Sequence, residues 1–441
     1  MDDTAPPRRG ALIDLSPLTA SAPFARLWGS RAVAGIGSQL TLVAVGLNVF
    51  ALVRPSEGAA AATFAVSLTG VLALVPTVLA GLYGGMLADA FDRRTVALVS
   101  GVVSWLSTVV LAALAWTGAE SVWSLYLLTV LTATATTVLQ ASESAATPRL
   151  LPRELLPAAG ALNGIAVGVS VTLGPGLAGV LVATTGFAWC YTIDAVLFVA
   201  TLVALLTLPR LPPEGAADRP GLASLAGGVD FLKRAPNIRT SFFVDIVAMT
   251  FGQPRVLYPA VGAVTLGGGA ITVGLLSAAF AIGALLSSLF SGRLGGVRRQ
   301  GVAIERAIQV YGACIALFGA VLAVAAIGEW TRVLPSPAGP VWIAIAAVLL
   351  AGAGGADNVS AIFRGTMLQT AAPDSMRGRL QGVFIVVVTG GPRVGDLWAG
   401  LLATTGLLFL PPLLGGVLIV GLVTLLVRRG FRDYDALRPT P

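Results

Sequence analysis

The sequence predicts an all-α membrane protein with twelve transmembrane helices, arranged as two six-helix bundles related by pseudo-two-fold symmetry. Three observations support this fold class. The 441 residues are 56% hydrophobic and only 11% charged, with a mean hydropathy of +0.87, whereas soluble domains carry about 25% charged residues. The apolar residues form runs that each approach the roughly 20 residues needed to span a bilayer. Short motifs also recur in the two halves of the chain.

Twelve apolar runs define the predicted spans. The longest polar stretch, 208–239, separates the sixth run from the seventh and is rich in proline, glycine and charge. We therefore predict an N-terminal tail (1–23), a first bundle (24–208), a linker (209–237), a second bundle (238–428) and a C-terminal tail (429–441). The predicted spans are 24–50, 61–88, 95–116, 121–145, 158–184, 187–208, 238–262, 269–293, 302–327, 340–365, 378–404 and 407–427.

The basic residues orient these spans. Nearly all arginines and lysines of the connecting segments fall on one side of the twelve-span map, and the opposite connections offer only Arg54 and Arg332. Because positively charged loops stay in the cytoplasm, we expect both termini and the linker to be cytoplasmic, in a multi-pass protein of the plasma or inner membrane. The net charge of +7 then reflects orientation. Nucleic acid is not expected as a partner, since basic patches interleaved with aromatic residues are missing.

The residues of common catalytic sites are scarce. Histidine is absent, and Cys190 and Cys314 lie inside apolar runs without metal-ligand spacing. No glycine-lysine motif for phosphate binding and no nucleophile–base pair is visible. The sequence therefore predicts a protein that is not an enzyme, with no cofactor, no metal and no catalytic residues. A proton gradient is the expected energy source, and carboxylates would have to carry the protons because histidine is missing.

An internal repeat relates the fifth and eleventh spans. The segment "GVLVATTGF" (179–187) closes one and "AGLLATTGL" (399–407) closes the other, and each follows a glycine-proline pair, Gly174-Pro175 or Gly391-Pro392. Such repeats are typical of transporters whose two bundles rock around a site near the midplane of the bilayer.

Four segments carry a family resemblance. "GGMLADAFDRR" (84–94) resembles the loop signature of the major facilitator superfamily, and "GVSVTLGPGLAGVLVATTG" (168–186) resembles the span-five motif of its drug:proton antiporters. "TPRLLPRELLPAAGALNG" (147–164) and "LQTAAPDSMRGRLQG" (368–382) are similar to two further loops of a narrower group, the enterobactin-exporter-like and macrolide-efflux-like proteins. The resemblance covers nearly the whole chain.

The resemblance implies two functional motifs. A cytoplasmic gate between the halves would join Asp89 to the start of span eleven, and its residues would be Gly85, Asp89, Arg93, Arg94, Arg377 and Arg379. Alternatively, this loop only sets the topology. The span-five motif, Gly168, Gly174, Pro175 and Gly179, would form a seal and hinge that favours antiport, although ordinary helix packing rests on the same small residues.

The sequence departs from the family pattern at three places. Ala90 stands where the loop signature has a basic residue, and Ser38 stands where many subgroup members have an acid. The span-four arginine motif that accompanies proton coupling is not visible. These departures concern the coupling mechanism and not the fold.

Charged residues inside spans are costly and usually line a cavity or pair with one another. Asp194 and Arg255 are two of them, and the resemblance assigns Asp194 a structural role. Arg393 and Asp396 share a helix face and are equally consistent with a self-neutralising pair. The polar candidates are equally consistent with helix–helix hydrogen bonding. The proton-coupling candidates are Asp245, Asp357, Asp396 and Glu143, and the substrate-cavity candidates are Arg31, Gln39, Asn48, Asn163, Gln253, Asn358 and Arg393.

These features together predict a secondary transporter. It would export a hydrophobic or amphipathic small molecule, of the drug, macrolide or siderophore class, by proton-coupled antiport with alternating access. The alternatives are a proton-coupled importer of a small solute and a non-transporting receptor or lipid-handling protein on the same fold. The expected partners are the small molecule, protons and membrane lipid, and the expected state is a monomer.

Overall fold

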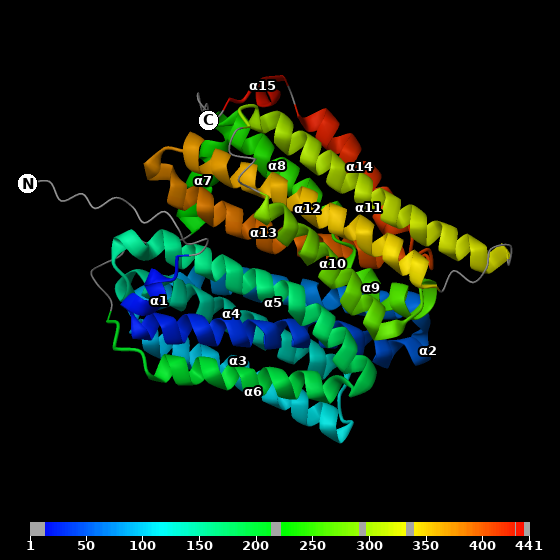
Figure 1. Ribbon diagram of the computed structural model, residues 1–441, viewed down its shortest axis with the longest axis horizontal. Coiled ribbons are helices and arrows are strands. Elements are labelled where there is room, and N and C mark those ends of the chain that lie inside the picture. The colour runs from blue at the N-terminus through cyan, green and yellow to red at the C-terminus, as the bar shows by residue number, and fades with distance from the viewer. Residues whose placement is uncertain (1–13, 213–221, 291–296, 332–338, 428, 436–441) are drawn as a thin grey trace, which may run out of the picture.

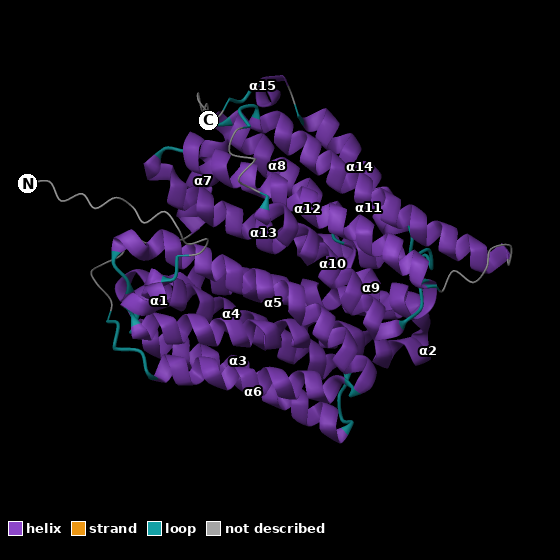
Figure 2. Cartoon of the chain, viewed as in Figure 1, coloured by secondary structure: helices purple, strands orange, loops and turns teal. Residues whose placement is uncertain are grey.

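The computed structural model describes residues 14–212, 222–290, 297–331, 339–427 and 429–435. Within these ranges the chain is almost entirely helical (Figure 2). Its only β-pairing there is an isolated bridge between Arg299 and Asp435. The α-helices are α1 (Ser16–Ala20), α2 (Ala22–Ala90), α3 (Arg93–Thr117), α4 (Val122–Leu150), α5 (Leu156–Thr184), α6 (Phe187–Leu206), α7 (Leu222–Arg234), α8 (Pro236–Phe251), α9 (Tyr258–Ala260), α10 (Gly269–Leu289), α11 (Gln300–Thr331), α12 (Pro340–Ala371), α13 (Asp374–Ala403), α14 (Leu410–Leu426) and α15 (Arg429–Arg432).

Eight of the described helices are long and apolar enough to cross a membrane. One of them, α2, covers the first two predicted spans, because it contains a sharp bend at Gly58, where φ is 83°. The described parts of the other ten predicted ranges also lie largely on helices, including α14, which is apolar but only 17 residues long. The all-α membrane fold is thus confirmed, while the number of twelve spans stays a prediction.

The helices form two groups along the chain. Helices α2 to α6 pack on one another, as do α8 to α14, and α5 against α10 and α2 against α13 join the two groups. In Figure 1 the first group lies below the second. We call the end where α2 begins and α14 ends the terminal side, and the end where α2 bends the opposite side. The exact bundle boundaries stay predictions.

The seventh predicted span is not one helix. Helix α8 ends at Phe251, and a 3-10 turn (Pro254–Leu257), the short α9 and a π-helix (Val261–Thr265) follow. Pro254 cannot donate a helix hydrogen bond, and the Tyr311 hydroxyl donates to the Gly252 carbonyl at 2.5 Å. A side chain at position 252 would overlap the Tyr311 ring. The expectation of a continuous helix over 238–262 is therefore wrong.

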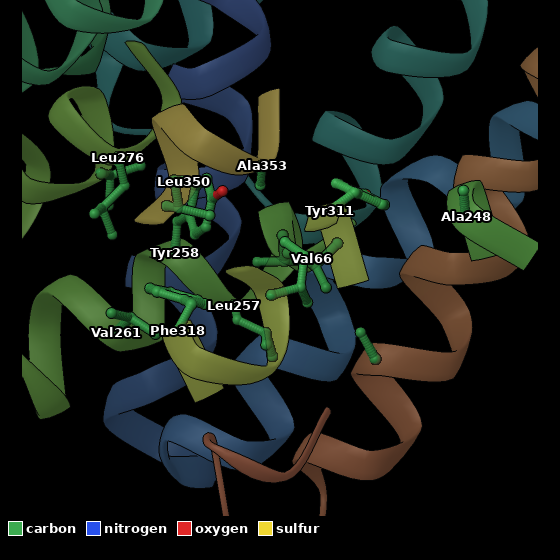
Figure 3. Close-up of a cluster of buried hydrophobic side chains, with 14 of the residues drawn as sticks. Val66, Ala248, Leu257, Tyr258, Val261, Leu276, Tyr311, Phe318, Leu350 and Ala353 are labelled. Atoms are coloured by element: carbon green, nitrogen blue, oxygen red, sulfur yellow. The ribbon is translucent and has the colours of Figure 1, made fainter. Parts of the chain in front are cut away.

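Large buried side chains surround this interruption (Figure 3). Leu257, Tyr258 and Val261 pack with Tyr311 and Phe318 of α11 in one hydrophobic cluster. The Tyr258 and Phe318 rings meet edge to face, with 6.4 Å between centroids. This packing holds the broken segment between the two groups of helices.

Candidate functional site

A cavity of about 350 Å³ lies between the two groups of helices. Both arms of α2, α5 and α10 contribute to it, together with the interrupted segment and α13. Its lining combines apolar, aromatic and charged groups, which is the usual composition of a small-molecule site. The lining includes Gln39, Leu42, Val43, Gly46, Val66, Thr69, Val171, Pro175, Gln253, Arg255, Tyr258, Ser277, Phe280, Val388, Pro392, Arg393 and Asp396.

Two arginines and one aspartate supply the charge of this central cavity. Arg255 lies in the 3-10 turn of the interrupted segment, and its guanidinium carbon lies 5.7 Å from the centroid of the Phe280 ring. Arg393 Nη1 lies 3.7 Å from Asp396 Oδ2 within α13. The interruption therefore presents Arg255 and Gln253 to the cavity, as broken helices do at transporter midplanes, and the lining carries one more positive than negative charge.

The Arg393–Asp396 pair lies directly on the other half of the molecule. An ideal Cβ on Gly70 of α2 would fall 2.8 Å from Asp396 Oδ2 and 3.0 Å from Arg393 Nη1. A larger residue at position 70 would displace the pair. Arg393 and Asp396 therefore form an ion pair with each other and also line the cavity, as the two predictions for them stated.

A buried ion-pair triad lies beside the interruption. Arg364 of α12 places Nη2 2.8 Å from Asp245 Oδ1 of α8 and 3.8 Å from Asp357 Oδ1. Its Nη1 also donates to Ser360 Oγ at 3.1 Å. Asp245 and Asp357, two proton-coupling candidates, are thus joined by one arginine that is 6% exposed.

The first half of the molecule has its own charged pair. Arg31 Nε of α2 lies 3.1 Å from Glu143 Oε2 of α4, and Glu143 is only 3% exposed. Both residues line a second cavity of about 250 Å³, together with Asn163 and Gln39. Gln39 also lines the central cavity, so the two cavities adjoin at this side chain.

Two predicted cavity residues form hydrogen bonds to neighbouring helices instead. Asn48 is 1% exposed and donates from Nδ2 to the Tyr191 hydroxyl of α6 at 3.3 Å. Asn358 donates from Nδ2 to the hydroxyls of Ser287 and Ser288 at 2.8 and 2.9 Å. Neither residue lines the two cavities. Both asparagines therefore fit the alternative prediction, in which polar side chains form hydrogen bonds between helices, because their partners belong to neighbouring helices.

Asp194 has no basic partner among the described residues. Its Oδ2 accepts a hydrogen bond from the Thr41 hydroxyl at 2.6 Å. Its Oδ1 lies against Gly37, where an ideal Cβ would fall 2.6 Å away. Asp194 therefore connects α6 to α2 inside the first half of the molecule.

The span-five motif forms close helix contacts on two sides. An ideal Cβ on Gly174 would overlap Gln39 of α2, and one on Gly179 would fall 2.9 Å from the Gly274 Cα of α10. Pro175 lines the central cavity, and Gly168 faces Leu285 at the edge of contact distance. The motif thus brings α5 against both halves of the molecule, whatever its part in transport.

The loop signature is described only in part. Gly85 and the side chains of Asp89, Arg377 and Arg379 lie outside the described residues, so the predicted gate contact stays a prediction. Arg93 Nη1 donates to the Ala145 carbonyl at 2.9 Å, and Arg94 Nη2 donates to the Leu206 carbonyl at 2.6 Å. Arg94 therefore binds the C-terminal end of α6, where cations are favoured, and Arg93 binds α4 five residues before its end.

The sequence did not single out Arg364 and indicated no specific role for Arg255. Arg364 lies one residue before the end of the tenth predicted range, so nothing in the sequence distinguished it from an arginine that ends a span. Gly252 and Pro254, flanking a single residue, were the available signal for an interruption that presents Arg255. Among the described residues no cluster of three histidine, cysteine or acidic side chains could hold a metal ion.

Solved structures with a similar fold are transporters. The chain matches a D-xylose-proton symporter with a TM-score of 0.67 and 14% identity, over 91% of this chain and 96% of that one. It matches the nucleoside transporter NupG (D323A mutant) with a TM-score of 0.67 and 13% identity, over 92% and 100%. At these identities the likeness concerns the fold.

Sequence comparison gives the family. The family model described as "Transmembrane secretion effector" matches residues 13–439. The chain is 30% identical to the Enterobactin exporter EntS of Salmonella paratyphi A, over 98% of both chains, and 30% identical to that of Escherichia coli O1:K1, over 98% and 97%. This chain is therefore a member of the transmembrane secretion effector family within the major facilitator superfamily, a secondary transporter and not an enzyme.

Proposed function

We propose that the protein exports an amphipathic small molecule of the siderophore or drug class in exchange for protons. The observation that carries the proposal is the central cavity between the two halves of the molecule, which is lined by Arg255 and Arg393 together with the Phe280 and Tyr258 rings. A ligand with an aromatic or apolar body and an anionic group would match this lining, because guanidinium groups bind anions and aromatic rings bind apolar surface.

The direction of transport is inferred from relatives and from the span-five motif. Relatives over the full length of the chain are named enterobactin exporters. Gly174 and Gly179 pack α5 tightly against α2 and α10, which supports a seal that limits leakage. The Gly179–Gly274 approach lies toward the opposite side, so this arrangement supports a state in which the cavity is closed on that side.

The triad of Asp245, Arg364 and Asp357 is the proposed proton site. Protonation of either aspartate would remove one of the two charges that hold Arg364. Arg364 would then shift toward the remaining carboxylate and release its hold on the other. Asp245 lies on α8, directly before the interruption of the seventh span, where Tyr311 binds the Gly252 carbonyl. A shift of Arg364 would therefore change the positions of Gln253 and Arg255 in the cavity.

Transport into everted membrane vesicles tests this function. Vesicles from an efflux-deficient host that contain the protein would be given a panel of labelled siderophores and drugs, with and without an uncoupler. We expect uncoupler-sensitive uptake of at least one amphipathic anion, and loss of uptake in Arg255→Gln. Asp245→Asn and Asp357→Asn should each transport at less than a tenth of the wild-type rate or lose proton dependence.

The matched control is Asp230→Asn in α7, an exposed acid that pairs with Lys233 and Arg234. Its uptake should equal that of the wild type. Normal, proton-dependent transport by both Asp245→Asn and Asp357→Asn would refute the proposed proton site. Uptake that is insensitive to the uncoupler would refute proton antiport itself.

A further inference from the structure

A third charged cavity lies outside the central site and the Arg31–Glu143 cavity, at the end of α11 on the terminal side. Its volume is about 660 Å³. Helix α11 contributes most of its lining and the short α15 contributes one side chain. The lining residues are Val297, Arg299, Val302, Ala303, Glu305, Arg306, Gln309 and Arg432.

The charge of this cavity is positive. Three arginines and one glutamate line it. Arg432 donates from Nε to Glu305 Oε2 at 2.7 Å and from Nη2 to Oε1 at 2.5 Å, so these two residues neutralise each other. Among the described residues neither Arg299 nor Arg306 has a carboxylate partner, although the Arg299 backbone pairs with that of Asp435. Two guanidinium groups therefore remain for an anion.

The C-terminal turn that carries Arg432 packs closely against α11 and α12. Gly301 lets the C-terminal turn lie against α11, because any side chain there would overlap the Phe431 carbonyl. Phe431 and Tyr434 are buried, at 2% and 1% exposed, and the Tyr434 hydroxyl shares a hydrogen bond with Thr370 Oγ1 at 3.2 Å. The cavity is therefore a built feature of the fold and not a chance gap between loose chain ends.

The same face of α11 continues into an apolar surface. One step of four residues leads from Arg306 to Val310, and two steps of seven lead on to Leu317 and Val324. All three apolar side chains are exposed, and such steps follow one helix face. Next to Gln309, the exposed side chain of Leu425 adds apolar surface from α14, where Gln309 Nε2 donates to Thr424 Oγ1 at 3.0 Å. A row of apolar side chains on a membrane-spanning helix faces lipid tails.

From the adjoining basic cavity and apolar row, we propose that Arg299 and Arg306 bind the phosphate of an anionic glycerophospholipid whose acyl chains lie along α11. The guanidinium fork matches phosphate geometry. Arg299 directly precedes α11 and Arg306 lies within its first two turns, so both arginines line the same cavity. Basic pockets between transmembrane helices recognise anionic lipids in this way. The site does not depend on the proposed transport function.

Native mass spectrometry of the purified protein tests this site. The detergent-solubilised full-length chain would be titrated with palmitoyl-oleoyl phosphatidylglycerol or with the corresponding phosphatidylcholine. We expect the anionic lipid to bind at least about tenfold more tightly, and the double variant Arg299→Gln/Arg306→Gln to lose this preference. The double variant Arg153→Gln/Arg210→Gln, which removes two exposed arginines elsewhere on the terminal side, should keep it.

Three results would overturn the proposal. The first is equal binding of the two lipids by the wild type, which requires no variant to fold. The second is an unchanged preference in Arg299→Gln/Arg306→Gln with an unchanged thermal midpoint. The third is full displacement of the lipid by a millimolar excess of inorganic phosphate, which would indicate a site for the soluble anion.

Discussion

In the first half of the molecule one buried carboxylate pairs with one arginine, whereas in the second half one buried arginine holds two carboxylates. Arg31 is 28% exposed and meets Glu143 beside a cavity. Arg364 is 6% exposed and lies between Asp245 and Asp357. The sequence predicts six helices in each half, yet the two halves differ in how their buried carboxylates pair with arginine. A carboxylate pair that shares one cation can change its charge by one without leaving the arginine unpaired.

The comparison also shows how each half tolerates charge in the membrane. An ion removed from water needs a close partner of opposite charge, or its burial costs several kcal/mol. In the first half, partial exposure of Arg31 lets water contribute. In the second half, protein groups must supply nearly all of the compensation. We therefore expect charge removal to be more damaging in the second half.

Replacing Arg364 should have the largest effect. Arg364→Met would leave Asp245 and Asp357 buried without their cation, and should lower the stability by about 3–5 kcal/mol. Thermal unfolding of the purified protein in detergent measures this loss. Adding Asp245→Asn to Arg364→Met should restore part of the stability, and Arg364→Lys should lose less. A melting midpoint for Arg364→Met equal to that of the wild type would show that the triad does not stabilise the second half.

The corresponding change in the first half should cost less. Arg31→Met leaves Glu143 without its partner, but Arg31 is 28% exposed and the pair lines a cavity, so we expect a loss of roughly 1–3 kcal/mol. The same thermal unfolding assay compares the two variants directly. Glu143→Gln should cost less than Arg31→Met because it leaves no buried charge. An Arg31→Met variant that is less stable than Arg364→Met would reverse the proposed order of the halves.

Removing an uncharged hydrogen bond should change the stability by a similar, small amount in the two halves. Asn48→Ala removes the bond to Tyr191 in the first half, and Asn358→Ala removes the bonds to Ser287 and Ser288 in the second. Interhelical hydrogen bonds in membranes contribute about 0.6 kcal/mol on average, so each variant should shift the melting midpoint slightly and by a similar amount. Loss of transport in either variant with unchanged stability would return that asparagine to the list of substrate contacts.

Parts of the candidate site followed from the sequence. Gln39, Gln253, Arg393 and Asp396 line the central cavity as expected of polar residues inside spans, because such residues avoid lipid. Their roles in transport stay predictions. Asn48 and Asn358 satisfied the same sequence criterion but bond to neighbouring helices. A single sequence shows that a side chain avoids lipid, and it does not show which neighbour it meets.

The sequence by itself determined the all-α membrane fold and the family, because the length of apolar runs and the loop motifs are local properties of the chain. Only the tertiary structure decided that Arg364 joins Asp245 to Asp357 and that Arg31 meets Glu143, since these partners are far apart along the chain. The interruption at Gly252 was decided there as well, because a hydroxyl from α11 binds the carbonyl that the broken helix leaves free. Buried charges in a membrane usually pair with a charge of opposite sign, and the packing of helices selects that partner, whereas Asp194 accepts a hydrogen bond from Thr41 instead.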